Sequence, residues 1–296
     1  MKTLKSILNG TKFSFTFLSV CLVFASCDYV NNTVQPTAAS NGGSNPSVIY
    51  KKVLVEDFTG HKCGNCPTAA AELKNLELTY AGKIIPVAVH AGYYAYTNAT
   101  YTTNFQTTEG NDYDLQFGNS AAGNPNGLIN RMGYGTAAFI RQWSSWNTEI
   151  AQQLNMPAKF QLKIKNNFNT TTKLLTTNIT VKALDNLNGQ YKLVVLLTED
   201  SIVAEQLDYS KPSGSQFISN YEFNHVLRGS LNSSWGETLF NTTINANDSI
   251  IKTYSNYSVN TSYNSKKCHV VAYVYDANSS SPTFYEVMQA EEGHVE

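Results

Sequence analysis

The sequence predicts an α/β domain followed by an all-β antiparallel sandwich. Residues 52–90 give a strand, a helix and a second strand in succession, whereas apolar and polar residues alternate in several runs after residue 158. The composition is 42% hydrophobic and only 15% charged, which favours strands and loops over long charged helices. A chain of 296 residues has room for about two domains, and we expect them at residues 49–155 and 156–296.

The N-terminal segment predicts export. Lys2 and Lys5 precede an apolar run at residues 13–24, and the small residues Ala25 and Ser26 stand before Cys27. This order is typical of a secretory signal, and the run is shorter than the roughly 20 residues of a spanning helix. We expect residues 1–26 to be a lipoprotein signal peptide cut before a lipidated Cys27. Residues 27–48, rich in Gly, Ser, Asn and Pro, would then carry the lipid and form a flexible tether. An ordinary cleaved signal with a soluble product is the alternative.

Charge gives no support for nucleic-acid binding. The formal net charge is −1, and no long run of Lys or Arg follows the N-terminus. Affinity for nucleic acid comes largely from basic side chains that contact phosphates. We therefore expect no nucleic-acid partner.

The first α/β unit places a pair of cysteines at its turn. Residues 52–58 are rich in Val and Leu and predict a buried strand, residues 67–80 have helical spacing, and "KIIPVAVHAG" predicts the next strand. Such a unit is a parallel βαβ crossover. Cys63 and Cys66 fall between the first strand and the helix.

That position favours redox chemistry. Thiolates are stabilised by the positive end of a helix dipole, and Lys62 adds a positive charge beside Cys63. With two residues between them, one thiol can attack a disulfide while the other resolves the mixed disulfide. A CxxC pair beside a βαβ pattern therefore predicts a redox site.

Beyond the cysteines, the sequence resembles the thioredoxin superfamily. Thioredoxins carry a buried acidic residue six positions before the first cysteine, where Asp57 stands, and the resemblance implies that Asp57 accepts the proton of Cys66. They also place a cis-proline before the next strand, which makes Pro125 the candidate and Asn124 the residue whose backbone pairs with an extended substrate. Lys62 departs from the Trp that usually precedes the first cysteine.

The chain also resembles the outer membrane protein 28-related lipoproteins of the Bacteroidota. The marks are Asp57-Phe58-Thr59-Gly60, the two cysteines followed by Pro67, His90-Ala91-Gly92, the stretch from Pro125 to Arg131, and the acidic end "EVMQAEEGHV". The resemblance implies an outer-membrane lipoprotein, periplasmic or surface-facing, with a thioredoxin-like domain. Asp57 replaces the Glu that is usual in this family.

The second half predicts the sandwich. Residues 136–154 have aromatic and aliphatic residues at helical spacing, and we expect them to form the last helix of the first domain. "KFQLKIK", "LLTTNITVKAL", "YKLVVLLTED", "CHVVAYVYDA" and "FYEVMQAEE" follow as strands, typical of an immunoglobulin-like sandwich. His225, Arg228 and Trp235 either line a cleft between the domains or are ordinary strand and loop residues. Cys268 is expected to be a buried structural thiol.

Two other interpretations of the cysteine pair are open. Cys63 and Cys66 are two zinc ligands if His61, His90 or His225 completes the site, although a second CxxC is missing and we expect no metal. Alternatively the pair is an inert structural disulfide. A disulfide that closes so short a loop contributes only about 2 kcal/mol or less, which gives little structural reason for it.

The sequence therefore favours an anchored thiol–disulfide oxidoreductase or a redox-dependent binding protein. Cys63 would be the nucleophile, Cys66 the resolving thiol and Asp57 the proton relay, while Asn124 and Pro125 contact the substrate backbone. Its partners would be exported proteins or peptides with cysteines. Cys27 would carry a lipid, and the reaction would need no bound cofactor. The alternative is a non-catalytic outer-membrane or surface binding lipoprotein whose cysteines stay bridged.

Overall fold

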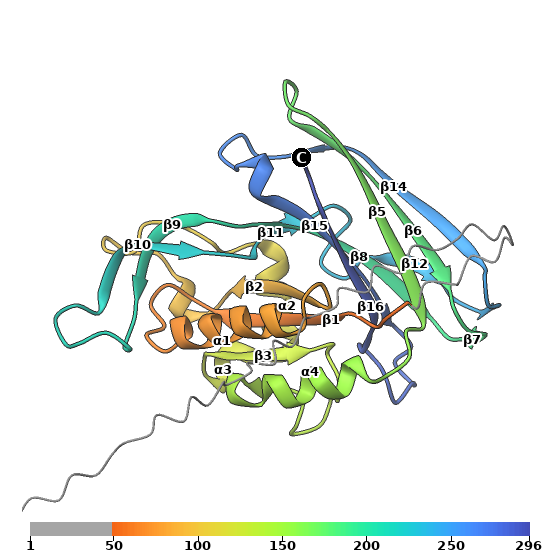
Figure 1. Cartoon of the computed structure of the whole chain (residues 1–296), viewed down its shortest axis with the longest axis horizontal. Coiled ribbons are helices and arrows are strands. Elements are labelled where there is room, and N and C mark those ends of the chain that lie inside the picture. Colours follow the sequence, from red (N-terminus) through yellow and green to blue (C-terminus); the bar gives the residue numbers. More distant parts are fainter. Residues whose placement is uncertain (1–48) are drawn as a thin grey trace, which may run out of the picture. The chain divides into compact units, whose positions relative to one another are not determined.

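A parallel strand–helix–strand unit opens the folded part of the chain. The computed structural model describes residues 49–296, beginning with β1 (Val53–Thr59), α1 (Cys66–Thr79) and β2 (Ile84–His90). β1 and β2 pair in parallel, with Val53 opposite Ile84 and Thr59 opposite His90 (Figure 1). The predicted βαβ crossover is therefore confirmed.

The other helices are short and the other strands numerous. The helical segments are η1 (Tyr93–Ala95), α2 (Thr108–Phe117), α3 (Asn119–Ala122), η2 (Trp143–Ser145), α4 (Trp146–Leu154) and η3 (Ser265–Lys267). The first strands after β2 are β3 (Asn126–Ile129), β4 (Arg141–Gln142), β5 (Phe160–Asn169), β6 (Leu174–Ala183), β7 (Leu187–Asn188), β8 (Tyr191–Glu199) and β9 (Ile202–Leu207). The last are β10 (Phe217–Phe223), β11 (Val226–Ser230), β12 (Glu237–Phe240), β13 (Thr243–Ile244), β14 (Ser249–Ser258), β15 (Cys268–Asp276) and β16 (Val287–His294).

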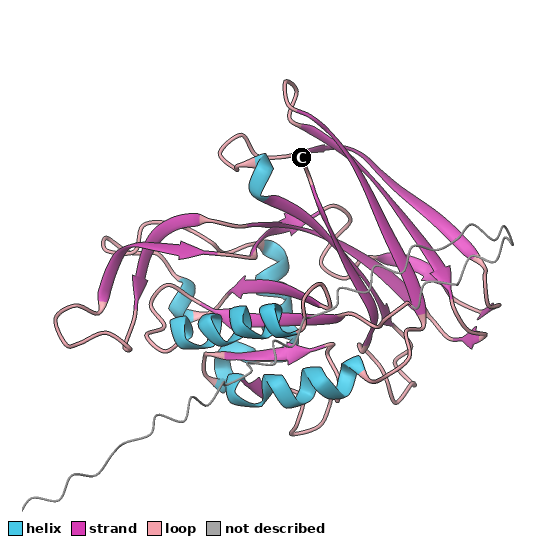
Figure 2. Ribbon diagram, viewed as in Figure 1, coloured by secondary structure: helices cyan, strands magenta, loops and turns pink. Residues whose placement is uncertain are grey.

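One mixed sheet joins the two halves of the sequence. Its strand order is β16-β15-β8-β11-β2-β1-β3-β4, and β12 pairs with β8 beside this path. The strand β11 connects the halves, because it pairs in parallel with β2 and antiparallel with β8. Figure 2 shows that the α-helices gather around β1, β2 and β3, while the rest of the described chain is mainly strand.

The predicted fold class is therefore wrong. An α/β thioredoxin-like domain and a separate immunoglobulin-like sandwich would each have a sheet of their own, whereas Val226 of β11 pairs with Ala88 of β2 within one sheet. Residues 49–296 belong to a single compact unit. The fold of the described residues is a mostly β structure built on this mixed sheet.

Burial on both faces of β8 explains the shared sheet. Leu193, Val195 and Leu197 point into one core, where they pack against β5 and β6. Val194 and Leu196 point the opposite way, into the core that also contains residues of β1, β2 and α2. A strand that is buried on both faces needs a layer on each side, so β8 cannot belong to an isolated two-sheet sandwich.

Two further layers cover the central sheet. The antiparallel sheet β14-β6-β5 packs over β8 and β15 and supplies Phe160, Leu175 and Ile179 to their common core. On the helical side, Leu73 of α1 and Ile150 of α4 pack on the face of β1 that carries Val53 and Val55. Cys268 in β15 is a buried free thiol, and burial raises its pKa to about 12.

The helix predicted at residues 136–154 forms only in its second half. Arg141 and Gln142 instead make the short strand β4, with Gln142 opposite Asn126 of β3. The single turn η2 follows, and α4 begins at Trp146. The indole of Trp146 is buried against the sheet. The apolar residues of this segment mark where the chain is buried, and the buried stretch is longer than the helix.

A buried ion pair ties β1 to the strands of the second half. Arg131 donates from Nε and Nη2 to the carboxylate of Glu56 over 2.7 and 2.6 Å, and from Nη2 to the hydroxyl of Tyr273 over 2.8 Å. The guanidinium also lies 4.7 Å from the ring centre of Tyr113. Arg131 and Glu56 are fully buried, so their charges depend on each other for solvation.

The predictions for the N-terminal segment concern residues before Ile49. The predicted signal peptide, Cys27 and the tether at residues 27–48 lie outside the described residues. Within residues 49–296, none of the helices has the length and apolar character that crossing a membrane requires.

Candidate functional site

Cys63 and Cys66 form a disulfide at the turn between β1 and α1. Their Cα atoms are 5.4 Å apart, and the N–H of Cys66 donates to the carbonyl of Cys63 over 3.1 Å. Cys66 is the first residue of α1, and no side chain caps that end of the helix. The free N–H groups there favour negative charge, which stabilises a thiolate when the disulfide is reduced.

A hairpin from the second half covers this turn. β9 and β10 pair with each other as a two-stranded sheet, which extends beside α1 in Figure 1. The N–H of Leu207 donates to the carbonyl of His61, and the N–H of Tyr209 to the carbonyl of Gly64, each over 2.8 Å. The end of β9 and the residues directly after it therefore pair with the cysteine turn through backbone hydrogen bonds, as an added strand would.

Side chains complete this cover. The amide of Gln206 donates to the carbonyl of Cys63 over 3.0 Å, and the ring of Tyr209 lies against Gly64. A Cβ atom at residue 64 would come within 2.5 Å of that ring, so the close approach requires glycine. Cys63 and Cys66 are only 3% and 2% exposed as a result.

Asp57 places a buried carboxyl on β1, the strand that precedes the cysteine turn. It lies on β1 between Ala88 of β2 and Gly127 of β3, and it is 3% exposed. Its Oδ1 atom has no hydrogen-bond partner among the described residues. Burial raises the pKa of Asp57 to about 7, and the nearby charge of His225 opposes part of this rise. A carboxyl with this pKa can gain or lose a proton near neutral pH.

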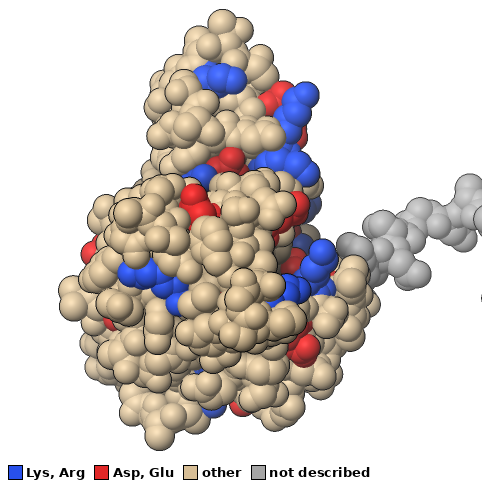
Figure 3. Space-filling view, turned by 90° about the vertical axis from the view of Figure 1, so that its left-hand side faces the viewer, with Lys and Arg blue, Asp and Glu red and all other residues tan. Residues whose placement is uncertain are grey.

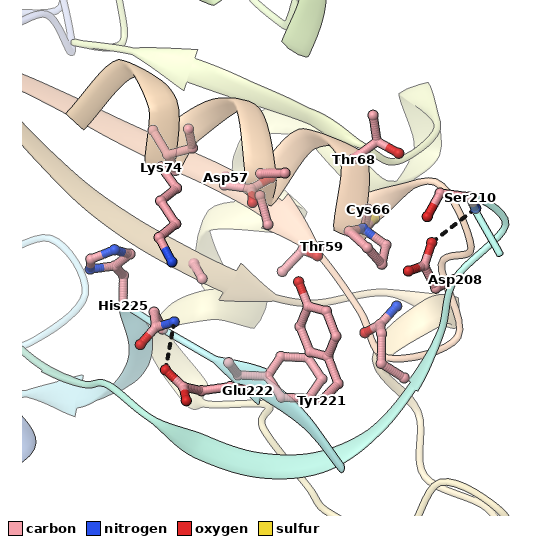
Figure 4. Close-up of a pocket in the computed structure, with 18 of the residues that line it drawn as sticks. Asp57, Thr59, Cys66, Thr68, Lys74, Asp208, Ser210, Tyr221, Glu222 and His225 are labelled. Atoms are coloured by element: carbon pink, nitrogen blue, oxygen red, sulfur yellow. Dashed lines mark hydrogen bonds between the residues drawn. The ribbon is translucent and has the colours of Figure 1, made fainter. Parts of the chain in front are cut away.

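A cavity of about 970 Å³ between α1 and the β9–β10 hairpin connects these groups. Asp57 and Cys66 both line it, whereas Cys63 does not. Figure 4 shows Cys66 and Asp208 at one end of the cavity, and Lys74, Glu222 and His225 towards the other. The structure thus brings together two of the predicted catalytic residues in one solvent-accessible space.

Of the three residues His225, Arg228 and Trp235, only His225 lines the cavity. Its Nε2 lies 3.2 Å from a carboxylate oxygen of Glu77, and its Nδ1 lies 3.4 Å from Asp200. Burial opposes its protonation, but the two carboxylates outweigh burial and raise the pKa of His225. Arg228 instead pairs with Glu199 over 2.8 Å, outside the cavity lining.

The other histidines near the turn pack against aromatic rings. His61 stacks on Tyr101 with ring centres 5.2 Å apart, and His90 lies 4.8 Å from Phe105. Burial lowers the pKa of His90 to about 3, so its imidazole is neutral at pH 7. Within residues 49–296, no group of three His, Cys, Asp or Glu side chains is placed to hold a metal ion.

Asn124 and Pro125 lie directly before β3 and do not line the cavity. The peptide bond between them is cis. β3 begins directly after them, and its Asn126 pairs with Phe58 near the end of β1. The side-chain amide of Asn124 has no hydrogen-bond partner in the described part of the chain.

Sequence reasoning missed the residues that cover the disulfide. Gln206 and Tyr209 lie some 140 residues after the cysteines in an irregular stretch, and neither belongs to a catalytic motif. The two glycines of the turn, Gly60 and Gly64, could have indicated this cover in the sequence. A Cβ at residue 60 would come within 2.5 Å of the backbone of Tyr94, so both glycines mark places where another segment approaches closely.

Two solved structures resemble this chain in fold. HBP35 of Porphyromonas gingivalis has a TM-score of 0.57 and 16% sequence identity, with 84% of this chain and 76% of that chain covered. A protein of Agrobacterium tumefaciens has a TM-score of 0.52 and 15% identity, with 84% of this chain and 97% of that chain covered. Identities this low establish similarity of fold alone. No curated protein matches the sequence.

The family comparison concerns the larger, C-terminal part of the chain. The model of the family described as "Outer membrane protein Omp28" matches residues 111–294, which begin after the cysteine turn and include the hairpin that covers it. The match extends over more than half of the chain and indicates an outer-membrane-associated protein. The chain therefore belongs to the Omp28 outer membrane protein family.

Proposed function

We propose that this protein exchanges thiols and disulfides with cysteines of exported proteins or peptides at the outer membrane. One observation carries the proposal: the Cys63–Cys66 disulfide lies at the N-terminus of α1, and the buried, unpaired carboxyl of Asp57 lines the same cavity as Cys66. Perturbed titratable groups that gather in a cavity are typical of functional sites. A purely structural disulfide has no need of a proton acceptor in the cavity that it lines.

In the proposed reaction, the reduced pair acts in two steps. The Cys63 thiolate attacks a substrate disulfide, forms a mixed disulfide with one substrate sulfur and releases the other as a thiolate. Cys66 then gives its proton to Asp57 and attacks the sulfur of Cys63. The second substrate thiolate leaves, and the Cys63–Cys66 disulfide forms again. The substrate gains two electrons, the protein loses two, and no bound cofactor is needed.

The proposal includes an anchor and a substrate contact. A lipid on Cys27 would hold the protein at the outer membrane, in keeping with its family. Asn124 and Pro125 would pair with the backbone of an extended substrate. Their place beside the end of β1 and the unpartnered amide of Asn124 support this contact.

An exchange assay with cysteine variants tests the proposal. The full-length protein is reduced and mixed with a fluorescence-quenched peptide disulfide, whose cleavage is followed over time. Cys63→Ser is expected to lower the rate to that of buffer. Cys66→Ser should cleave the peptide once per protein and then stop as a mixed disulfide on Cys63, because no thiol resolves it. Cys268→Ala is the matched control and should retain the rate, because the Cys268 thiol is buried and its pKa is about 12. Equal rates for the wild type and both serine variants would exclude exchange by this pair.

Removing the ring of Tyr209 is expected to expose the disulfide. Tyr209→Ala leaves the backbone bond to Gly64 in place but deletes the ring that lies against this glycine. We expect reduction by dithiothreitol to accelerate roughly tenfold, because access to the sulfur atoms limits attack. Thiol alkylation and mass spectrometry measure the rate. Tyr93→Ala, which removes another exposed ring near the turn, serves as the control. An unchanged rate in Tyr209→Ala would show that this ring does not shield the disulfide.

Burial of the disulfide favours a second candidate, a binding protein with bridged cysteines. Both cysteines are nearly inaccessible, and Tyr93, Tyr96 and Tyr209 expose 70%, 53% and 55% of their surface around the turn. Figure 3 shows that few charged side chains occupy the face at the left of Figure 1. Exposed tyrosines on a weakly charged surface are typical of protein-binding sites. The reduction potential of the pair separates the two candidates.

A further inference from the structure

The two cysteines of the disulfide have different surroundings. On the Cys63 side, the carbonyl of Cys63 accepts a bond from Gln206, and the ring of Tyr209 covers Gly64. On the Cys66 side lies the cavity between α1 and the hairpin, which Cys63 does not line. A reactant inside the cavity would therefore meet Cys66 first.

The size and lining of this cavity suit a small ligand. Its volume of about 970 Å³ lies near the upper end of the range for small-molecule sites, roughly 300 to 1,000 Å³. Pro67, Ala70 and Leu73 of α1 form an apolar wall, and Phe223 of the hairpin contributes another.

Charges of both signs lie at the end of the cavity away from Cys66. The ammonium group of Lys74 has no ion-pair partner within residues 49–296, and Figure 4 shows its side chain extending into the cavity towards His225. Across the cavity, the carboxylate of Glu222 accepts only long bonds, of 3.4 Å from Ser201 and 3.5 Å from Asn224. Lys74 can therefore pair with a ligand carboxylate and Glu222 with a ligand ammonium.

We propose that the cavity binds a short zwitterionic cysteine peptide, of two or three residues, and that its thiol exchanges directly with Cys66. The inference rests on the proposed exchange activity and adds a second reactant to it. Polypeptide substrates meet the pair at Cys63, and the small peptide thiol meets it at Cys66 from inside the cavity. The peptide thiol thus supplies electrons to the oxidised pair without displacing the hairpin.

The step balances with the peptide thiol as the reductant. The thiol gives its proton to the Asp57 carboxylate, and its sulfur attacks the sulfur of Cys66. The Cys63–Cys66 bond breaks and Cys63 leaves as a thiolate. A second peptide thiol gives its proton to the Cys63 thiolate, and its sulfur attacks the peptide sulfur of this mixed disulfide. Cys66 is released and takes the proton from Asp57. Two peptide thiols become one peptide disulfide, and the protein gains two electrons.

Four peptides that share one thiol test the inference. Gly-Cys-Gly is used with both termini free, with the N-terminus acetylated, with the C-terminus amidated, and with both ends blocked. Reduction of Cys63–Cys66 in the full-length protein is followed by rapid alkylation and mass spectrometry. We expect the zwitterion to react fastest. Lys74→Gln should slow only the peptides with a free carboxylate, by about three- to fivefold, the usual size of an exposed ion pair. Glu222→Gln should slow only those with a free amino group.

A distant lysine gives the matched control. Lys163 is exposed on β5, outside the cavity lining, and Lys163→Gln is expected to leave all four rates unchanged. Equal rates for the four peptides with the wild-type protein would overturn the inference. A uniform loss across all four peptides in Lys74→Gln would do so as well, because it would indicate a structural effect.

Trapping shows which sulfur reacts. Cys63→Ser and Cys66→Ser, each carrying a single thiol of the pair, are mixed with the oxidised form of Gly-Cys-Gly. We expect the mixed disulfide to form at least tenfold faster on Cys66 in Cys63→Ser than on Cys63 in Cys66→Ser. Faster trapping on Cys63 would overturn the inference, and the terminus-blocked series remains decisive if either variant fails to fold.

The same experiments keep the two proposals apart. If the pair cleaves the quenched polypeptide disulfide but shows no preference for charged peptides or for Cys66, the inference fails and the proposed function stands. If neither the polypeptide disulfide nor any small thiol exchanges with the pair, the proposed function itself fails.

Discussion

Replacing Arg131 by methionine is expected to lower the free energy of unfolding by about 3–5 kcal/mol. Methionine keeps the length of the side chain but leaves the buried carboxylate of Glu56 without its two charge-assisted hydrogen bonds. The hydroxyl of Tyr273 also loses a donor. Urea denaturation of the wild type and the variant measures the difference. The loss is a large share of the 5–15 kcal/mol that holds most domains folded.

A second replacement shows that the effect comes from the charge. Glu56→Gln combined with Arg131→Met removes both buried charges and should recover about 2 kcal/mol or more of the loss. The exposed pair of Lys159 and Asp185 is the control, since Lys159→Met should cost less than about 1 kcal/mol. A loss of under 1 kcal/mol in Arg131→Met would mean that the pair does not hold β1 to β15.

Asp57→Asn is expected to stabilise the protein above pH 7 while it slows exchange. Burial raises the pKa of Asp57 from 3.8 to about 7, so the folded state retains a proton that the unfolded state loses between these values. The free energy of unfolding therefore falls as pH rises from about 4 to about 7 and is level above that. One pKa unit corresponds to about 1.4 kcal/mol, so the variant should be more stable at pH 8 by up to about 4 kcal/mol. Urea denaturation across this range measures the slope.

The same substitution tests the chemical role of the carboxyl. The exchange rate of the wild type should rise with an inflection near pH 7, where Asp57 becomes able to accept a proton. Asp57→Asn should lose this inflection and react at least tenfold more slowly at pH 8. Asp185→Asn, on the exposed surface, is the control for the loss of one negative charge. A variant that exchanges as fast as the wild type across the range would remove Asp57 from the mechanism.

The cysteine turn was predictable because its determinants are local. The Val-rich run that forms β1, the proline after Cys66 and the helix formers of α1 lie within one short stretch, and a βαβ unit follows from that order. The place of Asp57 on β1, facing inward, follows from the same strand. These features need no knowledge of the rest of the chain.

The joining of the two halves was not predictable from strand alternation alone. The alternation pattern predicts that "YKLVVLL" and "CHVVAYVY" are strands of a separate sandwich, yet both are mainly apolar runs without a regular polar face. Such runs indicate burial on both sides. β8 and β15 indeed lie between two cores, and the parallel pairing of β11 with β2 then makes one sheet. The composition of a strand predicts that a second layer exists, but gives no information about which segment supplies it.

The cover over the disulfide depends on contacts between distant segments. Leu207 and Tyr209 bind the turn through their backbone N–H groups. Almost every residue has such a group, so the sequence does not show which residues make these hydrogen bonds. Tyr209 itself is one of many tyrosines in the chain. The sequence could therefore propose a reactive pair, while its shielding and the cavity on the Cys66 side required the structure.

The reduction potential of the Cys63–Cys66 pair tests the account most directly. The full-length protein is equilibrated against mixtures of reduced and oxidised dithiothreitol or glutathione, and its free thiols are then alkylated and counted by mass spectrometry. We predict a potential between about −120 and −270 mV, the range of disulfides that exchange in catalysis. A potential below about −300 mV, with thiols that alkylate slowly, would contradict an exchange function and identify the disulfide as structural.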